Sequence, residues 1–317
     1  MVSAVPTHNT TVAGCTMSDV FAYAEKVGRT DSTVLITGET GTGKEHLARY
    51  VHAHSRRAER AMICVNCAAL PDALLEGELF GYERGAYTGA HQAYPGKMKL
   101  AEGGTLLLDE IGELTPAAQA KLLRVIEDRE VFRLGARRSE SIDVRIIAAT
   151  NQDLESMVSE RRFRADLYFR LNVARVHVPP LRQRLEDVPL LFAYYLREMG
   201  KRTGVHLDGL SPEATACVMG YEWPGNVREL RNVVEALFID PPVGWIEPRH
   251  LPPNVVHKIR TLDRADSDER ERILSVLFAT EWNKCRAAQQ LNWSRMTLYR
   301  KLSKYRITRQ DDAGSAH

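Results

Sequence analysis

The feature that most constrains the fold of this 317-residue chain is a glycine-rich run in its first fifty residues. The run, Gly38-Glu-Thr-Gly-Thr-Gly43-Lys44, follows the apolar segment Val34–Thr37 and precedes an amphipathic stretch over residues 44–54. Glycines permit positive φ angles, so successive N–H groups can point into one concavity, and a following helix N-terminus attracts phosphate. A strand, a glycine loop ending in lysine and a helix therefore predict a phosphate-binding loop. A glycine turn without function explains this context poorly.

The segments that follow predict the remainder of an α/β domain. Short, continuous apolar runs at residues 62–65, Thr105–Asp109, 142–149 and 173–178 predict further strands, and Pro116–Asp128 has helical periodicity. Continuous apolar strands that alternate with helices are typical of a parallel sheet covered on both faces. From Glu186 to about residue 240 the periodicity is helical only, and Ser211 is a plausible helix start.

Two carboxylates close the predicted strand Thr105–Asp109, because Glu110 follows Asp109 directly. Ligands of open parallel sheets bind outside the carboxyl ends of the strands. Asp109 therefore suits Mg²⁺ coordination, and Glu110 suits orientation of a water that attacks a γ-phosphate. A strand that merely ends in a polar turn is the alternative, and the upstream glycine loop makes it the weaker one. Glu45 replaces the Ser or Thr that usually binds Mg²⁺ after the lysine, so the direct metal ligand stays open.

Four further polar residues lie in positions that suit phosphoryl transfer. Asn151 follows an apolar strand and could hold the attacking water. Arg164 and Arg170 are six residues apart, which does not place them on one helical face, so one loop-held and one helical arginine is the natural arrangement. Arginine supplied across a subunit boundary stabilises transition-state charge, although surface salt bridges are an alternative role. Arg228 follows a Trp-Pro-Gly-Asn turn near a helix start and could reach back to nucleotide.

Composition excludes several classes of protein. The chain is 44% hydrophobic and 26% charged, with a net charge of +2. No apolar run approaches the ~20 residues of a membrane helix, and the first residues lack the apolar core of a secretory signal. The five cysteines are scattered, which argues against a disulfide scaffold and for a reducing cytoplasm. We therefore expect roughly two domains in a cytoplasmic protein without a membrane partner.

The C-terminal segment is basic and has the pattern of a helix-turn-helix. No Asp or Glu lies among its eight cations, which are Lys284, Arg286, Arg295, Arg300, Lys301, Lys304, Arg306 and Arg309. Ser294 is a good N-cap for a second helix, in which Leu298, Leu302 and Tyr305 would face the core. The residues left for DNA are Arg295, Thr297, Arg300, Lys301 and Lys304. A solvated basic face or a helical oligomerisation unit is the alternative.

Together these residues resemble the AAA+ ATPase domain of bacterial enhancer-binding proteins, the activators of sigma-54 RNA polymerase. The likeness covers nearly the whole chain from Thr33 to Ile307. Its most specific element resembles the family's GAFTGA loop and consists of Gly85, Ala86, Tyr87, Thr88, Gly89 and Ala90. The family usually has Phe where this chain has Tyr87. The final helices resemble the Fis-type helix-turn-helix of many such activators.

The resemblance implies a role for each matching residue. The Walker A residues are Gly38, Glu39, Thr40, Gly41, Thr42, Gly43, Lys44 and Glu45, which would bind ATP together with the sensor II residue Arg228. The Walker B residues are Asp109 and Glu110, with Asp109 as the metal-binding residue. Asn66 matches the switch asparagine that restrains the catalytic glutamate, and Asn151 matches sensor I. Arg164 and Arg170 match the paired arginine fingers, and residues 131–140 form the second substrate-facing loop.

The resemblance also implies an organisation. We expect a lead-in over residues 1–30, an α/β ATPase subdomain over 31–180 and an α-helical lid over 181–253. A linker over 254–267, an all-α DNA-binding domain over 268–309 and a tail over 310–317 complete the chain. ATP and Mg²⁺ would be the cofactors, and a homo-oligomeric ring, a hexamer, would act on the sigma-54 holoenzyme from upstream DNA.

With so short a lead-in, the chain resembles the stand-alone members of the family, which lack an N-terminal regulatory domain. Those members are controlled by a partner protein in trans or by expression level. Two alternatives to a sigma-54 activator stay open at this point. One is a DNA-binding repressor with a vestigial ATPase domain, and the other is an AAA+ remodeller of a different substrate. The intact Lys44 and Glu110 oppose the first, and the loop at residues 85–90 opposes the second.

Overall fold

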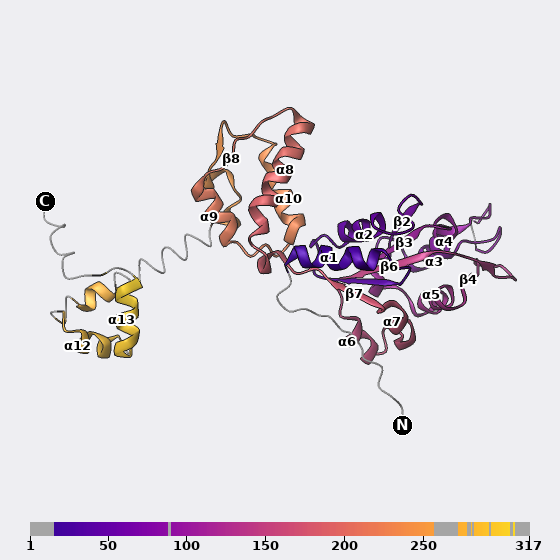
Figure 1. Cartoon of the computed structure of the whole chain (residues 1–317), viewed down its shortest axis with the longest axis horizontal. Helices are drawn as coiled ribbons and strands as arrows, with labels where there is room; N and C mark the ends of the chain where they lie inside the picture. The colour runs from indigo at the N-terminus through magenta and orange to yellow at the C-terminus, as the bar shows by residue number, and fades with distance from the viewer. Residues whose placement is uncertain are drawn as a thin grey trace, which may run out of the picture. The chain divides into compact units, whose positions relative to one another are not determined.

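A computed structural model describes residues 16–87, 90–256, 272–277, 280, 282–291, 293–304 and 307 of the chain (Figure 1). They form two compact units. The described residues of Met1–Val205 and Glu222–Ile239 make up the first unit, and those of His206–Tyr221 and Asp240–His317 make up the second. Among the described residues, no helix combines the length and the apolar character that crossing a bilayer requires.

The centre of the first unit is a five-stranded sheet in the order β2-β3-β6-β1-β7, and every strand pair is parallel. The strands are β1 Val34–Thr37, β2 Met62–Asn66, β3 Thr105–Asp109, β6 Arg145–Thr150 and β7 Ala174–His177. The prediction of a parallel sheet is confirmed. The fourth strand begins at Arg145 rather than at residue 142, because residues 140–141 pair with another short strand instead. All five carboxyl ends lie at one edge, where ligands of such sheets bind.

Helices cover both faces of this sheet (Figure 1). They are α1 Met17–Gly28, α2 Lys44–Ala53, α3 Asp72–Phe80, α4 Gly96–Leu100, α5 Pro116–Asp128, α6 Leu154–Ser159 and α7 Ala165–Leu171, with the 3₁₀ turn η1 Ile111–Glu113. The same unit also contains the 3₁₀ turn η2 Leu181–Gln183 and the helices α8 Asp187–Thr203 and α10 Asn226–Leu237, which pack against each other. Alternate residues of β6 enter opposite cores: Ile146 and Ala148 pack with α5, whereas Ile147 and Ala149 pack with α2. This alternation explains why the strands read as continuous apolar runs.

The expected lead-in contains a helix of the core. Thr16 and Asp19 cap α1 reciprocally, each side chain bonding to the other's backbone N–H. Val20, Ala24 and Val27 then bury one face of α1 in the cluster that holds α2 and one side of the sheet. Residues 1–15 of the lead-in lie outside the described part of the chain.

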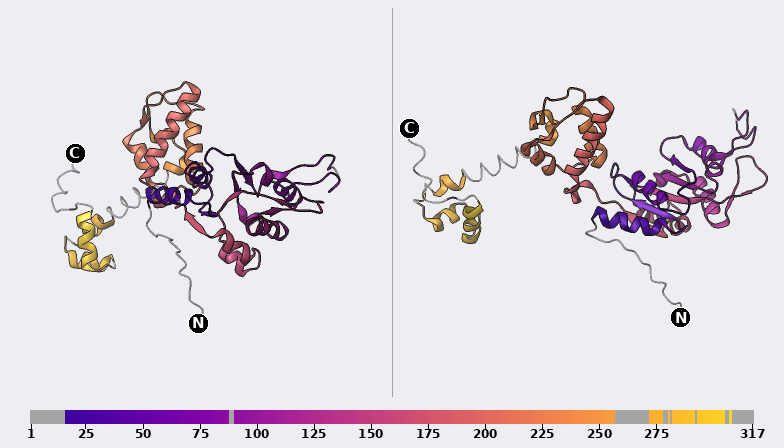
Figure 2. Two further views of the ribbon diagram at one scale, coloured as in Figure 1. Left: turned by 45° about the vertical axis from the view of Figure 1, so that its right-hand side comes forward. Right: turned by 45° about the horizontal axis from the view of Figure 1, so that its top comes forward.

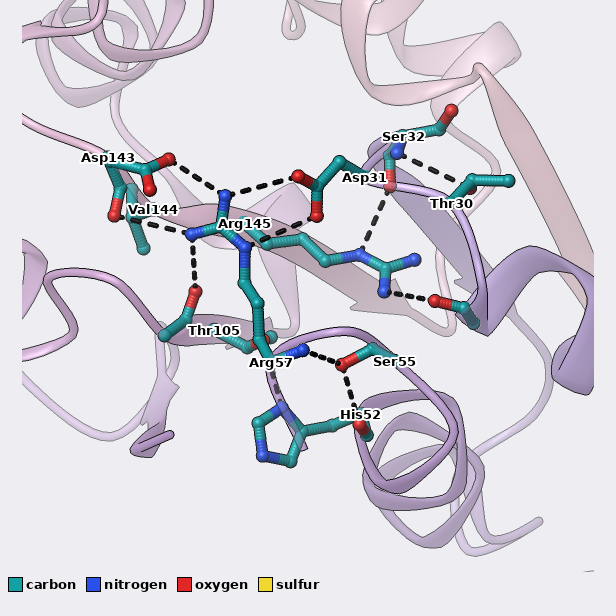
Figure 3. Close-up of polar contacts among 12 residues, drawn as sticks. Thr30, Asp31, Ser32, His52, Ser55, Arg57, Thr105, Asp143, Val144 and Arg145 are labelled. Atoms are coloured by element: carbon teal, nitrogen blue, oxygen red, sulfur yellow. Dashed lines mark hydrogen bonds and ion pairs between the residues drawn. The ribbon is translucent and has the colours of Figure 1, made fainter. Parts of the chain in front are cut away.

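A buried arginine ties α1 to the amino end of the sheet (Figure 3). Arg145, the first residue of β6, is only 2% exposed. Its guanidinium donates to the carbonyls of Val27 and Gly28 at 2.9 Å each, so it gives the Gly28 carbonyl a donor at the end of α1 and joins Thr30 at the Val27 carbonyl. Next to it, His52 Nδ1 lies 2.9 Å from Thr105 Oγ1. The interior polar groups at this end of the sheet therefore have fixed partners.

A second arginine completes this polar cluster (Figure 3). Arg57 forms ion pairs with Asp31 at 3.2 Å and with Asp143 at 2.8 Å. It also donates to the carbonyl of Gly104 at 3.2 Å. The pKa of Asp31 is lowered mainly by the hydrogen bond from Arg57. These contacts join the segment after α1 to the turns that precede β3 and β6.

In the second unit, two short strands correct one expectation. β8 Gly209–Leu210 pairs in parallel with β9 Trp245–Ile246, so the prediction of helices only between Glu186 and residue 240 is wrong at β8. A two-residue strand is too short to leave a periodicity in the sequence. The next helix, α9 Pro212–Gly220, begins as predicted at Ser211, whose Oγ accepts from the N–H of Ala214 at 3.1 Å.

The C-terminal helices form a separate apolar cluster. α12 Lys284–Gln290 and α13 Arg295–Lys304 pack through buried residues that include Ala287, Leu298 and Leu302. Ser294 caps α13 by accepting from the N–H of Thr297 at 3.1 Å, as predicted. Tyr305, the third expected core residue, lies outside the described residues, as do residues 257–267 of the expected linker.

Candidate active site

The glycine loop lies between the carboxyl end of β1 and the start of α2. Gly43 has φ +102° at the N-cap of α2, a conformation that glycine adopts without strain. Gly41 has φ +78°, and a Cβ there would lie 2.5 Å from the carbonyl oxygen of Gly225. Only glycine fits that close approach, so the sequence pattern reflects a tight contact between the loop and the segment that leads into α10.

Lys44 lies inside the concavity that the loop encloses. Its side chain is 6% exposed, and Nζ donates to the carbonyls of Gly38 at 3.0 Å and Glu39 at 3.3 Å. The carboxylate of Glu110 is 3.8 Å away. Burial lowers the pKa of Lys44, while the charges of Glu110 and Asp109 oppose that shift. The ammonium group is therefore held by backbone carbonyls in a site where phosphate oxygens would be stronger partners.

The acidic pair faces the same cleft from the end of β3. Burial raises the pKa of Asp109, the neighbouring charge of Glu110 adds to the rise, and Lys44 opposes it. Glu110 has φ 53° and ψ 52°, a left-handed conformation that costs a non-glycine residue free energy. Its N–H donates to Asp109 Oδ1 at 3.1 Å. Strain of this kind is found where the surrounding structure aims a side chain at a functional site.

Asn151 connects the acidic pair to the glycine loop. Its Nδ2 donates to Thr40 Oγ1 at 2.8 Å, and its backbone N–H donates to Glu110 Oε2 at 3.2 Å. The sensor position at the end of β6 therefore contacts both the loop and the second carboxylate. The structure brings together Lys44, Asp109, Glu110 and Asn151, as predicted from widely separated parts of the sequence.

These residues line an open cleft of about 430 Å³. The loop and the acidic pair form one wall, and α8 and α10 form the other, which includes Tyr195, Arg228 and Arg231. A cleft of this size, with charged groups on both walls and the aromatic ring of Tyr195 on one of them, is large enough for a nucleotide.

The donor set fits a magnesium ion that is completed by phosphate and water. Asp109 and Glu110 supply hard carboxylate oxygens to the cleft. Glu45 also borders it, but its carboxylate is held by Arg49 at 2.7 Å. No group of three or more His, Cys, Asp or Glu side chains is placed for metal binding among the described residues. Mg²⁺ commonly binds through one or two carboxylates, substrate phosphates and water, which matches this site.

Three predicted catalytic residues, Arg164, Arg170 and Asn66, are not among the residues that line the cleft of their own chain. Arg164 directly precedes α7 and forms an ion pair with Asp166 at 2.7 Å, and Arg170 lies in α7 and bonds to Glu127 at 2.8 Å. One is thus loop-held and the other helical, as expected, and both are exposed.

Asn66 lies at the carboxyl end of β2, in register with Asp109. Its Oδ1 accepts from the N–H of Ala68 at 2.9 Å. Within the described residues, no hydrogen bond joins Asn66 to Glu110. The switch contact that the resemblance implies is therefore not formed in this conformation, and the role of Asn66 stays a prediction.

The loop over residues 85–90 is closed at its base. The N–H of Gly85 donates to the carbonyl of Ala90 at 2.9 Å, and Ala90 is buried. Tyr87 is exposed and packs edge-on against Tyr82, with ring centroids 5.1 Å apart. Ala86 lies between Gly85 and Tyr87 in sequence. The remaining loop residues, Thr88 and Gly89, lie outside the described part of the chain.

A second loop stands beside the first (Figure 2). It connects β4 Glu130–Val131 to β5 Glu140–Ser141, and its Leu134 exchanges backbone hydrogen bonds of 2.9 Å with Gly81 and Glu83. Arg133 adds ion pairs to Glu83 at 3.3 Å and Glu140 at 2.6 Å. The two loops therefore share a bonded base, as expected for a pair that meets one partner.

Sequence reasoning missed the residues that hold the glycine loop from behind. Arg182 forms an ion pair with Glu39 at 2.6 Å, and buried Arg184 donates to the carbonyl of Thr42 at 2.9 Å. Asn226 also contacts the loop and is fully buried. The one available signal was Asn226 itself, since asparagine after Pro-Gly at a helix start favours a left-handed conformation with a committed side chain.

The expected DNA-facing residues of α13 differ in their surroundings. Arg295 and Arg300 are exposed, whereas Thr297 and Lys301 are partly buried. The Lys301 ammonium lies 6.0 Å from the centre of the Trp293 ring. The side chain of Lys304 lies outside the described residues. Of the expected DNA-facing residues whose side chains are described, only these two arginines are exposed, and their role stays a prediction.

Comparison with known proteins identifies the family. Residues 12–177 match the family described as the Sigma-54 interaction domain. The chain belongs to the sigma-54-dependent transcriptional activators. Residues 182–268 match the AAA+ ATPase lid domain, and residues 268–305 match the bacterial regulatory proteins of the Fis family. This activator thus has an AAA+ ATPase domain, its lid and a Fis-type helix-turn-helix, which confirms the predicted fold class.

Two curated relatives from Escherichia coli K12 resemble the activator over most of its length. It is 45% identical to the transcriptional regulatory protein ZraR over 294 residues, which is 91% of this chain and 67% of ZraR. It is 41% identical to the regulatory protein AtoC over 309 residues, or 93% of this chain and 67% of AtoC. The chain thus spans about two thirds of the length of these relatives.

Solved structures of a further relative share the fold. NtrX from Brucella abortus is 34% identical to the activator and superposes with a TM-score of 0.71 over 93% of this chain and 69% of NtrX. NtrX has also been solved in complex with ATP, and that structure matches with a TM-score of 0.69 over 94% of this chain.

Proposed function

We propose that the chain hydrolyses ATP in the cleft between the glycine loop and α10, and uses the energy to remodel the closed complex of sigma-54 RNA polymerase. The observation that carries this proposal is the convergence of Lys44 and Glu110, 3.8 Å apart, at the mouth of a cleft large enough for a nucleotide. The match to the Sigma-54 interaction domain favours this function over a vestigial ATPase and over a remodeller of another substrate.

The residues of the cleft divide the work of phosphoryl transfer. The glycine loop binds the phosphates through its backbone N–H groups, and Lys44 exchanges its carbonyl partners for β- and γ-phosphate oxygens. Asp109 and the phosphates would hold Mg²⁺, which would supply charge neutralisation at the transferred group when bound. Glu110 orients the attacking water and accepts its proton, while Asn151 fixes Glu110 from behind. Arg228, at the cleft wall, senses the bound phosphates.

Arg164 and Arg170 act on the nucleotide of a neighbouring subunit. Both lie outside the cleft of their own chain and are exposed around α7. Their ion pairs with Asp166 and Glu127 are solvent-exposed and weak, so exchange for phosphate is inexpensive. A head-to-tail arrangement of this kind closes into a ring, and we propose a hexamer.

The loop over residues 85–90 touches sigma-54 rather than nucleotide. Its residues carry no acid, base or metal ligand, and Tyr87 offers an exposed ring with a polar group. Its base is bonded to the second loop, so the two move together when the core changes state. ATP hydrolysis would thereby become a push on the polymerase subunit.

The helix-turn-helix concentrates the ring at upstream DNA. Arg295 and Arg300 would read base edges or phosphates, with Thr297, Lys301 and Lys304 beside them, and two-fold half-sites are expected. Both proposed partners, polymerase and chromosome, place this activity in the bacterial cytoplasm. A regulatory protein acting in trans would be a further partner.

Open-complex formation by sigma-54 RNA polymerase tests the function as a whole. The purified chain with ATP should convert closed to open complexes, and Thr88→Ala should abolish this conversion while ATPase activity persists. A Thr88→Ala chain that hydrolyses ATP and opens promoters normally would refute the role of the loop.

Mixing two inactive variants tests the shared site. Glu110→Gln and Arg170→Gln should each lack ATPase activity alone. An equimolar mixture should recover roughly a quarter of the wild-type rate, because random head-to-tail assembly gives that share of interfaces both intact groups. If Arg170 acts on its own subunit's nucleotide, the mixture stays inactive, and the shared-site proposal fails.

A further inference from the structure

Asn226 begins α10 and lies against the glycine loop, with none of its surface exposed. Its Nδ2 donates to the carbonyl of Thr40 at 3.1 Å and to Glu39 Oε2 at 3.2 Å. Its Oδ1 accepts from the N–H of Leu181 at 2.8 Å. Both amide hydrogens and the amide oxygen are therefore engaged, and all of them by segments distant in sequence.

The backbone around Asn226 also takes part in the contact between the start of α10 and the glycine loop. Asn226 has φ 52°, a left-handed conformation that asparagine tolerates better than most residues. The preceding Gly225 keeps α10 close to the loop, where its carbonyl would lie 2.5 Å from a Cβ on Gly41. The Arg228 N–H also donates to the Gly41 carbonyl at 3.2 Å. The start of α10 is thus fitted to the glycine loop by backbone and side chain together.

Hydrogen bonds continue from Thr40 to the catalytic carboxylate. Thr40 Oγ1 accepts from Asn151 Nδ2 at 2.8 Å, and the N–H of Asn151 donates to Glu110 Oε2 at 3.2 Å. The other oxygen of Glu110 lies 3.8 Å from Lys44 Nζ. A continuous path therefore runs from Asn226 through Thr40 and Asn151 to Glu110.

We propose that Asn226 is a positioning residue for ATP hydrolysis. It fixes the backbone of Thr40, so that the Thr40 hydroxyl holds Asn151 and Asn151 holds Glu110 toward the attacking water. The inference rests on the proposed ATPase function and assigns a role to a residue that never touches the nucleotide. The relay also gives α10 a direct influence on hydrolysis, because a shift of this helix would move Thr40 first.

The neighbouring arginines do not lie on this path. Arg182 pairs with the carboxylate of Glu39, and Arg184 donates to the carbonyl of Thr42, on the other side of Gly41. They brace the loop, whereas Asn226 alone among these three contacts the residue that bonds to Asn151. Removal of a brace should weaken ATP binding, and removal of the relay should slow the chemical step.

Two near-isosteric substitutions interrupt the relay at successive points. Asn226→Asp keeps an oxygen for the Leu181 N–H but cannot donate to the Thr40 carbonyl. Thr40→Val removes only the hydroxyl that Asn151 binds. Each should lower kcat by about tenfold, because misplacement of catalytic groups by fractions of an ångström costs rate. KM for ATP should stay within about twofold in Asn226→Asp, and Thr40→Ser should restore kcat.

The double variant separates a relay from a structural role. If both residues act through Asn151, then Asn226→Asp combined with Thr40→Val should be no slower than Thr40→Val alone. Independent structural damage would instead give additive losses, near a hundredfold in kcat. Asn254→Asp is the matched control, since Asn254 Nδ2 donates to Tyr221 Oη at 3.0 Å in the second unit, and its kcat should not change.

Each other outcome is decisive. If Asn226→Asp does not fold, Asn226→Gly, which keeps the left-handed backbone, replaces it in the same cycle. Additive losses, a rise in KM without a change in kcat, or failure of Thr40→Ser to restore activity would overturn the relay while the ATPase function stands. A wild-type chain that hydrolyses no ATP would overturn the proposed function, and the relay with it.

Discussion

The two ends of the parallel sheet carry buried charges in opposite situations. At the amino end, Arg145 is surrounded by carbonyl acceptors from α1, and Arg57 is paired with Asp31 and Asp143. At the carboxyl end, the charges border an open cleft, and Lys44 donates to loop carbonyls with a carboxylate 3.8 Å away. Burial of charge is therefore not in itself a sign of function.

The pKa shifts express the same contrast. At the amino end, the hydrogen bond from Arg57 lowers the pKa of Asp31, so its charged form is the stable one. At the carboxyl end, burial lowers the pKa of Lys44 and raises that of Asp109. Burial therefore disfavours the charged form of both groups, which is the form that catalysis needs. A bound nucleotide with its metal would relieve this penalty. Burial also lowers the pKa of Arg145 and of His52 at the amino end, so groups held at a cost indicate a functional site only where they line an open cleft, as Lys44 and Asp109 do.

The largest expected effect is on the carboxyl end, with Lys44→Met. The substitution keeps the length of the side chain and removes its charge, so we expect ATPase activity to fall at least about a hundredfold. The free energy of unfolding of the nucleotide-free chain should not decrease, because a buried ammonium group is removed. Phosphate release and urea unfolding measure the two quantities. A Lys44→Met chain that hydrolyses ATP at half the wild-type rate would remove the contrast between the ends.

Asp109→Asn should lower ATPase activity and raise the stability of the folded chain. The raised pKa means that the folded state favours the neutral carboxyl. The stability from this group is thus present at acid pH, where the carboxyl is protonated, and is lost as pH rises through the folded pKa. At pH 7 the asparagine chain should melt at a higher Tm, with ATPase activity down by about a hundredfold. A lower Tm would show that Asp109 is paired as firmly as the amino-end acids.

Arg145→Met should show the reverse pattern at the amino end. The carbonyl of Gly28 would lose its buried donor, whereas that of Val27 keeps the N–H and hydroxyl of Thr30, and an unsatisfied buried group costs about 1–3 kcal/mol. We expect the free energy of unfolding to fall by roughly 3 kcal/mol in urea titrations, while KM for ATP of the folded chain is unchanged. A change in KM comparable to that of a cleft variant would mean that this cluster is more than a structural anchor.

The smallest expected effect is a pH dependence from His52. Burial lowers the pKa of His52 below its ordinary 6.5. As pH falls below 6.5, the unfolded chain gains a proton that the folded chain does not, so stability declines until the folded pKa is passed. His52→Asn should flatten the decline of Tm in this window, without affecting ATPase activity at pH 7.5. An unchanged decline would assign it to other groups.

Sequence reasoning found those parts of the site whose local pattern has a direct physical meaning. Gly38–Lys44 between a strand and a helix predicted the phosphate loop, and two carboxylates after a buried strand predicted the acidic pair. The parallel sheet then required both to meet at one edge, as they do. Arg164 and Arg170 were predicted with the correct loop and helix placement, although their catalytic role still awaits the mixing experiment.

The other parts of the fold and of the site depend on tertiary contacts that no local sequence pattern predicts. Arg145 interrupts an apolar strand pattern, and the sequence alone does not show that α1 supplies carbonyl acceptors for it. Asn226 follows a turn and reads as a helix cap, although its side chain bonds to the glycine loop. β8 is too short to have a period. In each case the partner lies far away in sequence, and only the folded chain shows which groups meet.

The central claim is that the nucleotide state of the cleft controls the grip of the loop on sigma-54. The most direct measurement is the affinity of labelled sigma-54 for the chain by fluorescence anisotropy, with ADP and aluminium fluoride as a mimic of the transition state, or with ADP alone. We predict binding at least about tenfold tighter with the mimic, and loss of that difference in Lys44→Met. Equal affinity in both nucleotide states would contradict the account.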